Sequence, residues 1–298
     1  MPKLNHLDHQ QLHLLDRLLD LAIDEDVGEG DATTKALFPS PGLASGFFVA
    51  RQEGVMAGGE VLRRFYARLG ARFADNASAV SIDLLRKDGE DFPPGCRLLG
   101  VYGDAGLLLT GERIALNILQ RMCAIAGRTR EFVRRTAGAK AKIYDTRKTT
   151  PGNRILDKLA VLAGGGENHR MGLYDMILVK DNHLSLYDGP AKAVRAARQQ
   201  SSLPVMVEVD AIRQLEDILA AEPDYVLLDN MDAATLTKAV RLAEQSVLTK
   251  GLKRPLLEAS GGIILDTVAA VAASGVDRIS VGLLTSGAGT VDIGLDFS

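Results

Sequence analysis

The chain has 298 residues with a formal net charge of −3, and 46% of them are hydrophobic. That length and composition allow a substantial buried core, in one large domain or in two unequal ones. Aromatic residues make up only 5%, with no Trp, and there is no basic surplus, which argues against a nucleic-acid-binding protein. Any strong positive field must be local, so we expect a small anionic ligand rather than a polymer.

The number of cysteines and the length of the apolar runs indicate the cellular compartment. The two cysteines, Cys96 and Cys123, are too few for a disulfide framework and fit a reducing environment. No apolar run reaches the roughly 18 residues that span a bilayer. Polar residues also interrupt the first leucines, where a signal peptide would have its apolar core. We therefore expect a cytoplasmic protein that has no membrane partner.

Leucines at helical spacing begin the chain and predict an amphipathic helix that ends near Val27 and Gly28. From about residue 44 to 103, short apolar segments bounded by glycine predict strands, and residues 63–69 are expected to be helical. The strand segments are GFFVAR, GVMAGG and CRLLGVYG. We interpret residues 1–115 as an N-terminal α+β sandwich domain, which the C-terminal segment 286–298 joins.

A long helical pattern with one apolar stripe follows, from about Thr110 to Thr136. Beyond it, six short apolar runs alternate with helical segments, which predicts a parallel sheet covered on both faces. The runs are KIYD, MILV, PVMVEV, YVLLD, LLEAS and RISVG. The expected helices cover 188–200, 211–221, 232–248 and 264–274.

The ends of these strands decide between a barrel and an open sheet. In a barrel all carboxyl ends meet at one rim, whereas an open sheet concentrates ligands at a single switch point. Nearly every predicted strand ends in a polar residue or glycine: Asp145, Lys180, Glu208, Asp229, Ser260 and Gly282. We predict an α/β fold in which residues 116–285 form an incomplete parallel α/β barrel, because six units fall short of eight.

Cations follow the first predicted barrel strand and a later glycine run. Arg147 and Lys148 come directly after the strand, and glycines 164–166 precede His169 and Arg170. Arginine offers a planar fork to a carboxylate or phosphate, lysine offers a point charge, and glycine lets the backbone approach a ligand closely. A solvated loop and a helix C-cap are the structural alternatives for these two segments.

The next strand ends carry a lysine and two acids. Lys180 could act as an electrostatic clamp or as a Schiff-base nucleophile. Asn182 could orient a loop, and His183 could be purely structural. Glu208 and Asp229 are suited to bind sugar hydroxyls or to hold Mg²⁺ against a phosphate, and ion pairs with nearby lysines are the alternative.

Glycine loops after the last two strands indicate a phosphate site. In barrels of this class, such loops bind phosphate through backbone N–H groups and a helix N-terminus. The residues are Ser260, Gly261, Gly262 and Gly282. Because cations outnumber acids at the predicted rim and are costly there without an anion, the sequence predicts a pocket for a phosphorylated sugar and a second small anion.

Several motifs resemble the quinolinate phosphoribosyltransferase family of type II phosphoribosyltransferases. They are DTRKTTPG, GGGENHRMGLYDMILVKDNH, EASGGI and SVG, with EDVGEGDATT and GERIALNILQR before them. The resemblance implies transfer of phosphoribose from phosphoribosyl pyrophosphate to quinolinate with decarboxylation, giving nicotinate mononucleotide, pyrophosphate and CO₂ in NAD biosynthesis. It also implies Mg²⁺ bound with the donor, and a homodimer or larger homo-oligomer with a shared active site.

The same resemblance implies roles for single residues. The quinolinate carboxylates would be bound by Arg113 of the partner subunit together with Arg147, His169, Arg170 and Lys180. The catalytic groups would be Lys148, which helps to hold the donor, Lys180, and the acids Glu208 and Asp229, which contact ribose hydroxyls and Mg²⁺. The 5′-phosphate would bind Ser260, Gly261, Gly262 and Gly282.

Two segments, Cys123–Gly127 and Leu283–Gly287, depart from the family pattern. They motivate one alternative, a paralogous phosphoribosyltransferase that acts on another base. A sugar-phosphate-binding protein without turnover and a Schiff-base aldolase that uses Lys180 are the others.

Overall fold

The computed structural model describes residues 4, 7–40, 42–73 and 80–298. The chain forms two compact units. The first consists of Met1–Arg130, Thr149–Gly165 and Leu284–Ser298, and the second of Glu131–Lys148 and Gly166–Leu283. The chain therefore leaves the first unit, returns to it for residues 149–165, and returns again at its C-terminal end.

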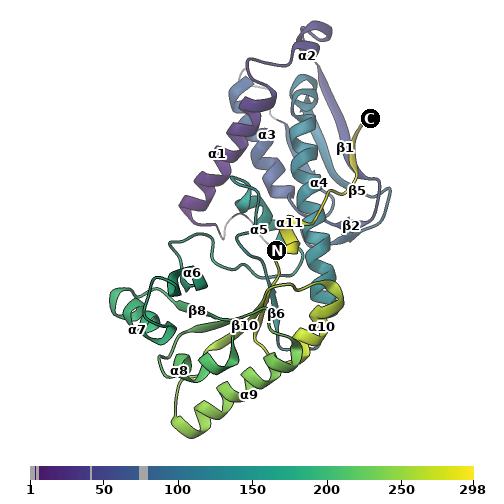
Figure 1. Cartoon of the computed structure of the whole chain (residues 1–298). Helices are drawn as coiled ribbons and strands as arrows, with labels where there is room; N and C mark the ends of the chain where they lie inside the picture. The colour runs from purple at the N-terminus through teal and green to yellow at the C-terminus, as the bar shows by residue number, and fades with distance from the viewer. Residues whose placement is uncertain (1–3, 5–6, 41, 74–79) are drawn as a thin grey trace. The chain divides into compact units, whose positions relative to one another are not determined.

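An antiparallel sheet with the order β12-β1-β5-β3 organises the first unit. Its strands are β1 (Leu43–Ala50), β3 (Ser81–Leu84), β5 (Arg97–Asp104) and β12 (Ile293–Phe297). A second pair is formed by β2 (Gly54–Val55) and β4 (Asp91–Phe92). Phe48 of β1 pairs with Leu295 of β12, so the last residues of the chain complete the sheet that begins near residue 43 (Figure 1).

Helices complete the first unit. They are α1 (His9–Asp26), α2 (Ala32–Leu37), α3 (Gly59–Phe73), most of α4 (Ala105–Arg135), α5 (Arg154–Ala163) and, from its second residue, α11 (Leu283–Ser286). The helix expected over 63–69 begins four residues earlier, because the Asp88 carboxylate accepts the N–H groups of Gly58 and Gly59, each at 3.1 Å. Burial raises the pKa of Asp88, and these two N–H groups oppose that shift.

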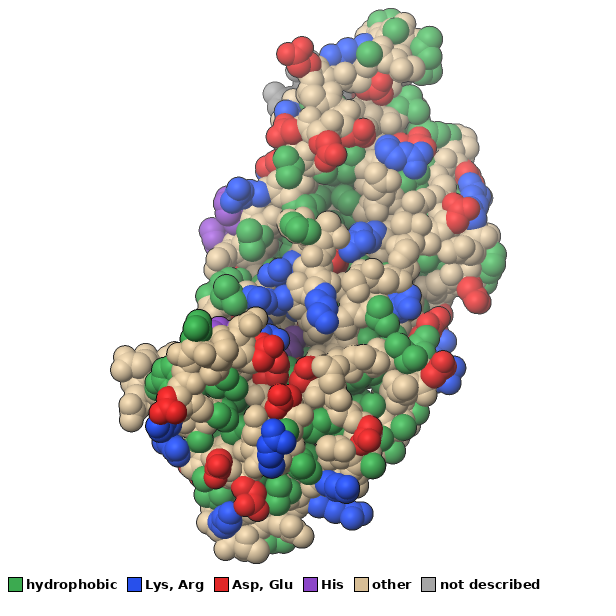
Figure 2. Space-filling view, viewed as in Figure 1, with side chains coloured by type: hydrophobic (Ala, Val, Ile, Leu, Met, Phe, Trp, Pro, Cys, Tyr) green, Lys and Arg blue, Asp and Glu red, His purple; other side chains and the backbone are tan. Residues whose placement is uncertain are grey.

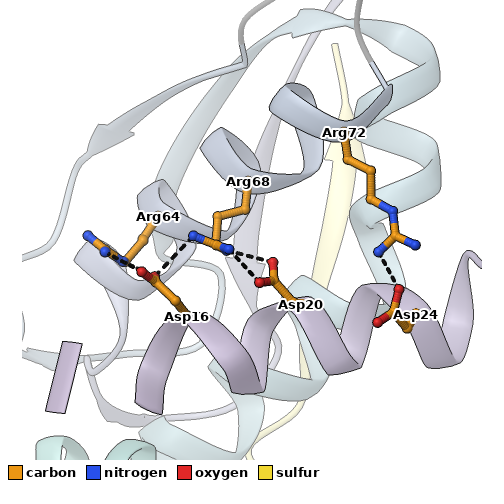
Figure 3. Close-up of polar contacts among 6 residues, drawn as sticks. All are labelled: Asp16, Asp20, Asp24, Arg64, Arg68 and Arg72. Carbon is orange, nitrogen blue, oxygen red and sulfur yellow. Dashed lines mark hydrogen bonds and ion pairs between the residues drawn. The ribbon is translucent and has the colours of Figure 1, made fainter. Parts of the chain in front are cut away.

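Helices α1 and α3 are joined by a row of ion pairs, shown in Figure 3. The pairs are Asp16–Arg64, Asp20–Arg68 and Asp24–Arg72. Both partners advance by four residues from one pair to the next, so the two helices run side by side in the same direction. Arg68 also lies 3.3 Å from Asp16, which links the first two pairs.

We expect Arg68→Met to lower the free energy of unfolding by about 1 kcal/mol at pH 7, because two part-exposed pairs worth 0.2–1 kcal/mol each are lost. The Arg64 guanidinium holds the pKa of Asp16 below its usual value. The ionised Asp16 carboxylate therefore stabilises the fold above about pH 3.9, and this contribution is lost as the pH falls through its lowered pKa. Urea unfolding at pH 7 and pH 3 measures both effects, with Arg17→Met on the exposed side of α1 as the control. Equal losses at both pH values would contradict an ionic origin.

The second unit is a six-stranded parallel sheet with the order β6-β11-β10-β9-β8-β7. Its strands are β6 (Lys142–Tyr144), β7 (Ile177–Val179), β8 (Val205–Val209), β9 (Tyr225–Asp229), β10 (Leu256–Ser260) and β11 (Arg278–Ser280). From β7 to β11 each strand pairs with the next in sequence, and β11 pairs with β6, so the described order is a circle open between β6 and β7. This order confirms the incomplete barrel, because a doubly wound sheet reverses direction at a switch point.

Helices lie on the outside of this sheet (Figure 1). They are α6 (Asp181–Leu184), α7 (Pro190–Gln200), the 3-10 turn η2 (Ile212–Gln214), α8 (Leu215–Leu219), α9 (Ala233–Lys250) and α10 (Leu265–Ala273). Each of the four helical ranges expected from the sequence overlaps α7, α8, α9 or α10, and α9 extends two residues beyond its expected end. Inside the barrel, Met176, Leu178, Met206 and Leu227 form an apolar cluster.

The open edge of the barrel is partly filled by the segment around Glu167. Glu167 donates its N–H to Ile143 O at 2.8 Å, and Asp145 donates its N–H to Glu167 O at 3.1 Å. The two bonds lay this segment parallel to β6, with a bridge between Tyr144 and Glu167. As a result, His169 and Arg170 follow directly beside the carboxyl end of β6.

The boundary expected at residues 115 and 116 differs from the division that the structure shows. Residue 115 lies inside α4, and the first unit extends through Arg130. Residues 149–165 also belong to the first unit, where Arg121 of α4 holds Asp157 of α5 at 3.0 Å through both oxygens. The sequence pattern hides this return, because β6 followed by α5 reads like any other strand–helix unit of the barrel.

Candidate active site

Oppositely charged side chains gather at the carboxyl ends of the barrel strands. Lys180, which follows β7, donates a hydrogen bond from Nζ to Glu208 Oε2 of β8 at 2.8 Å. Burial raises the pKa of Asp229 at the end of β9, Glu208 raises it further, and Lys180 and Lys148 counteract both. These four groups therefore lie within electrostatic reach of one another, as the parallel strand ends require. Figure 2 shows acidic side chains beside basic ones on this face of the second unit.

The glycine loop after β10 folds against the loop after β9. Asp229 pairs in register with Ser260, and Asn230 donates its N–H to Ser260 O at 2.8 Å. Gly261 and Gly262 have φ angles of +89° and +61°, which side-chain-bearing residues rarely adopt. A Cβ on Gly261 would also come within 2.2 Å of Asn230 Oδ1. Glycine is therefore required at 261, and the loop lies directly beside Asp229.

Gly282 serves a different close approach. A Cβ there would lie 2.9 Å from Cδ of Lys148. The stem of Lys148 therefore crosses the backbone just beyond β11, and Val281 donates its N–H to Tyr144 O at 2.9 Å on the adjacent strand. This packing brings the first cationic loop and the last glycine loop of the barrel together.

Two guanidinium groups lie within electrostatic reach of one another at the open edge. Arg170 is buried, and its Nη1 donates to Met176 O at 3.0 Å. Burial lowers the pKa of Arg170, the charge of Arg147 lowers it further, and Asp175 opposes both. Like charges held together in a partly dry site favour a multiply charged anion as the ligand.

His169 is held by the protein at three atoms. Its N–H donates to Asp145 Oδ1 at 2.8 Å, and its Nδ1 accepts the N–H of Arg170 at 2.7 Å. Its Nε2 lies 3.3 Å from Glu258 Oε1. The ring nitrogens that the sequence interpretation gave to a substrate carboxylate thus have protein partners.

Three further residues were singled out from the sequence. Arg113 belongs to the first unit, where it is exposed on α4. His183 accepts the N–H of Lys180 on Nδ1 at 3.0 Å, which fits the structural role considered for it. Asn182 lies in α6, where its carbonyl accepts from Ser185 Oγ at 2.9 Å.

The two segments that depart from the family pattern have packing roles in the first unit. Cys123 is fully buried in α4 and donates from Sγ to Ala57 O at 3.6 Å. Burial raises the pKa of its thiol to about 12, so it is no nucleophile. At the other segment, Arg128 donates to Gly287 O.

Sequence reasoning missed Glu258 and Arg278 as site residues. Both are buried within apolar strands, Glu258 on β10 and Arg278 on β11, and they pair in register. The available signal was a charged residue within or at the start of an apolar run, Glu258 inside LLEAS and Arg278 at the head of RISVG. A full charge inside a covered strand has to find a partner inside the barrel.

Comparison with known proteins agrees with the fold and the motifs. Residues 31–123 match the N-terminal domain of quinolinate phosphoribosyl transferase, and residues 125–296 match its C-terminal domain. Nicotinate-nucleotide pyrophosphorylase [carboxylating] from Mycobacterium leprae is 40% identical over 92% of this chain and 94% of that protein. A probable protein of the same name from Bacillus subtilis (strain 168) is 37% identical over 98% of this chain and 94% of its own.

Solved structures give the same result. The nicotinate-nucleotide pyrophosphorylase from Francisella tularensis superposes with a TM-score of 0.85 at 32% identity and covers all of both chains. The matched domains, the relatives and this superposition extend over nearly the whole chain. This chain therefore belongs to the quinolinate phosphoribosyl transferase family.

Proposed function

We propose that this protein transfers the phosphoribosyl group of phosphoribosyl pyrophosphate to quinolinate with loss of CO₂, giving nicotinate mononucleotide and pyrophosphate for NAD biosynthesis. The observation that carries the proposal is the gathering of Lys148, Lys180, Glu208 and Asp229 at the strand ends of a barrel in a chain of this family. Cations and acids in one cluster suit a substrate pair with several negative charges and a reaction that develops positive charge.

Quinolinate carries two carboxylates on neighbouring ring carbons. Arg147 and Arg170 each offer a planar pair of donors, and their mutual repulsion is relieved when such a dianion lies between them. Lys180 adds a point charge at the adjoining strand end. We assign the base to this side of the site, where the pyridine nitrogen is held in line with the ribose carbon.

The donor binds along the glycine loops in this proposal. The 5′-phosphate accepts N–H groups of Ser260, Gly261, Gly262 and Gly282, and Lys148, which crosses Gly282, holds the donor beside them. Glu208 and Asp229 face the ribose hydroxyls. As pyrophosphate departs, positive charge grows on the sugar ring, and these two carboxylates stabilise it.

The acidic pair also fits a magnesium ion. Mg²⁺ usually takes one or two protein carboxylates and completes its shell with substrate phosphates and water. Glu208 and Asp229 supply two carboxylates in electrostatic contact, and among the described residues no group of three or more metal-binding side chains is found. We propose that Glu208 and Asp229 hold Mg²⁺ together with the donor, where the ion neutralises pyrophosphate.

After the ribosyl bond forms, the pyridine ring becomes cationic. Loss of CO₂ from the adjoining carbon leaves an electron pair that the pyridinium stabilises. Because a proton replaces the lost carboxylate, the arginine that faced it loses its partner, which favours release of the product. An aldolase reaction has less support, since Lys180 is engaged in an ion pair with Glu208.

Incubation of the purified protein with quinolinate, phosphoribosyl pyrophosphate and Mg²⁺ tests the proposal. We expect nicotinate mononucleotide and CO₂ in equal amounts, and no product when the metal is chelated. Absence of both products with the metal present would reject it. Preference for nicotinate or another mono-acid would instead identify a paralogue that acts on a different base.

We also propose a homodimer or larger homo-oligomer with a shared site, in which Arg113 of the partner subunit binds quinolinate. Exposure of Arg113 on α4 supports this assignment, and the two free cysteines support a reducing, cytoplasmic location. Arg113→Ala and Lys180→Ala are each expected to be inactive alone. Mixed at equal amounts with subunit exchange, they should recover about one quarter of wild-type activity, because half the dimers contain one intact site of two. No recovery despite exchange would show that Arg113 acts within its own chain.

A further inference from the structure

A buried triad of His169, Glu258 and Arg278 lies inside the barrel of the second unit. The Glu258 carboxylate is fully buried on β10. Arg278 Nε lies 2.8 Å from its Oε2, and His169 Nε2 lies 3.3 Å from its Oε1. Each carboxylate oxygen thus lies within ion-pair distance of one basic side chain, one from a strand and one from the segment at the open edge.

Arg278 is fixed from both sides. Its Cζ lies 3.8 Å from the ring centroid of Tyr144 on β6 and 4.8 Å from that of Tyr225 on β9. Cations over tyrosine rings are stabilised, more so where water is excluded. Burial opposes ionisation of Glu258, but His169 and Arg278 outweigh it and hold its pKa below the usual value. The carboxylate is therefore charged, and its contacts with Arg278 and His169 fix its orientation.

The hydrogen bonds of His169 define its tautomer. Nδ1 accepts the N–H of Arg170 at 2.7 Å, so that nitrogen carries no proton. The ring proton is then on Nε2, the nitrogen that lies 3.3 Å from Glu258 Oε1. The backbone N–H of His169 is held by the buried Asp145. One residue further on, the guanidinium of Arg170 reaches Met176 O.

We infer that Glu258 is a positioning residue: it holds the Nε2–H form of His169, which fixes the backbone of Arg170 and so places the Arg170 guanidinium for the substrate anion. His169 is then part of the support beneath the site. The quinolinate KM measurement described below rests on the proposed function, whereas the NMR measurement does not. Displacement of a binding group by about 1 Å is enough to cost around 10²-fold in rate.

Two matched double variants separate this role from simple charge balance. Glu258→Gln with Arg278→Met keeps an acceptor for His169 and removes the cation, whereas Glu258→Met with Arg278→Met removes both. Replacing a buried ion pair by neutral groups of similar volume is compatible with stability. We expect similar thermal midpoints for the two. The first should retain a quinolinate KM within about twofold of wild type, and the second should raise it about tenfold while the KM for the donor stays unchanged.

Equal quinolinate KM values in the two double variants would overturn the inference and leave Glu258 as a counter-ion of Arg278. A second measurement does not depend on activity. Nitrogen NMR of histidine-labelled wild-type protein at pH 7, with the signal assigned by its loss in His169→Gln, should show Nδ1 without a proton and Nε2 with one. A proton on Nδ1 would overturn the inference even if the double variants fail to fold. An enzyme that shows this tautomer but does not convert quinolinate would reject the proposed function and keep the positioning role.

Discussion

Arg147→Ala is expected to lower kcat/KM for quinolinate by roughly 10²- to 10³-fold, because truncating one partner of a desolvated charge pair costs about 2–5 kcal/mol. The thermal midpoint should barely change. Arg147 repels Arg170 in the absence of ligand, so its removal relieves repulsion in the free protein. Arg147 is therefore expected to favour substrate binding while it adds repulsion to the free folded protein.

Steady-state kinetics and thermal unfolding of the same preparations test this expectation. Arg147→Lys is an informative companion, since it keeps the charge but loses the planar fork and should recover only part of the activity. Arg195→Ala, on the exposed side of α7, is the control for loss of an arginine from the second unit. A midpoint several degrees lower for Arg147→Ala would mark Arg147 as a structural residue.

The barrel was predictable because its signal is local and repeated. Apolar runs such as PVMVEV and YVLLD form strands in their own right, and the polar residue that ends each run necessarily lies at the shared rim of a parallel sheet. The proximity of Lys180, Glu208 and Asp229 follows from that rule alone. Their contacts in the structure agree with it.

Other features depend on partners that are distant in sequence. Glu258, 89 positions later, lies 3.3 Å from Nε2 of His169, and the N–H of Arg170 occupies the other ring nitrogen. A histidine beside an arginine after a glycine run gives no indication of this. The sequence pattern therefore predicts His169 as a site residue but could not decide which way its ring nitrogens face.

The glycine loops could be predicted from the sequence, but the groups that approach them could not. The sequence predicts phosphate-binding loops at Gly261 and Gly282, and the groups that approach these two glycines in the structure are the side chains of Asn230 and Lys148. Both neighbours come from other strand ends, so only the assembled rim reveals them. These contacts and the proposed phosphate binding are compatible, because glycine leaves the loop N–H groups uncovered.

Asp229→Asn is expected to lower kcat by about 10²- to 10³-fold, because it removes negative charge from the place where the ribose becomes cationic. The same change should leave the thermal midpoint at pH 7.5 equal to wild type or higher. Burial and the neighbouring Glu208 raise the pKa of Asp229, so its ionised form is unfavourable in the folded protein. The wild-type carboxyl contributes stability below about pH 3.9 and loses it as the pH rises through the raised pKa.

The sign of this effect distinguishes a catalytic carboxylate from a structural one. Thermal unfolding of both proteins at pH 4 and pH 7.5 should show that the midpoint of the variant increases relative to that of wild type as the pH rises. The same variant should have lost most of its turnover. Asp277→Asn is the contrasting control: burial opposes ionisation there, but Lys140, the Leu257 N–H and Arg254 outweigh it and lower the pKa. That variant should lose stability at pH 7.5. If Asp229→Asn instead behaves like Asp277→Asn, the two acids of the rim are held for the fold, and the proposed stabilisation of the ribose cation fails.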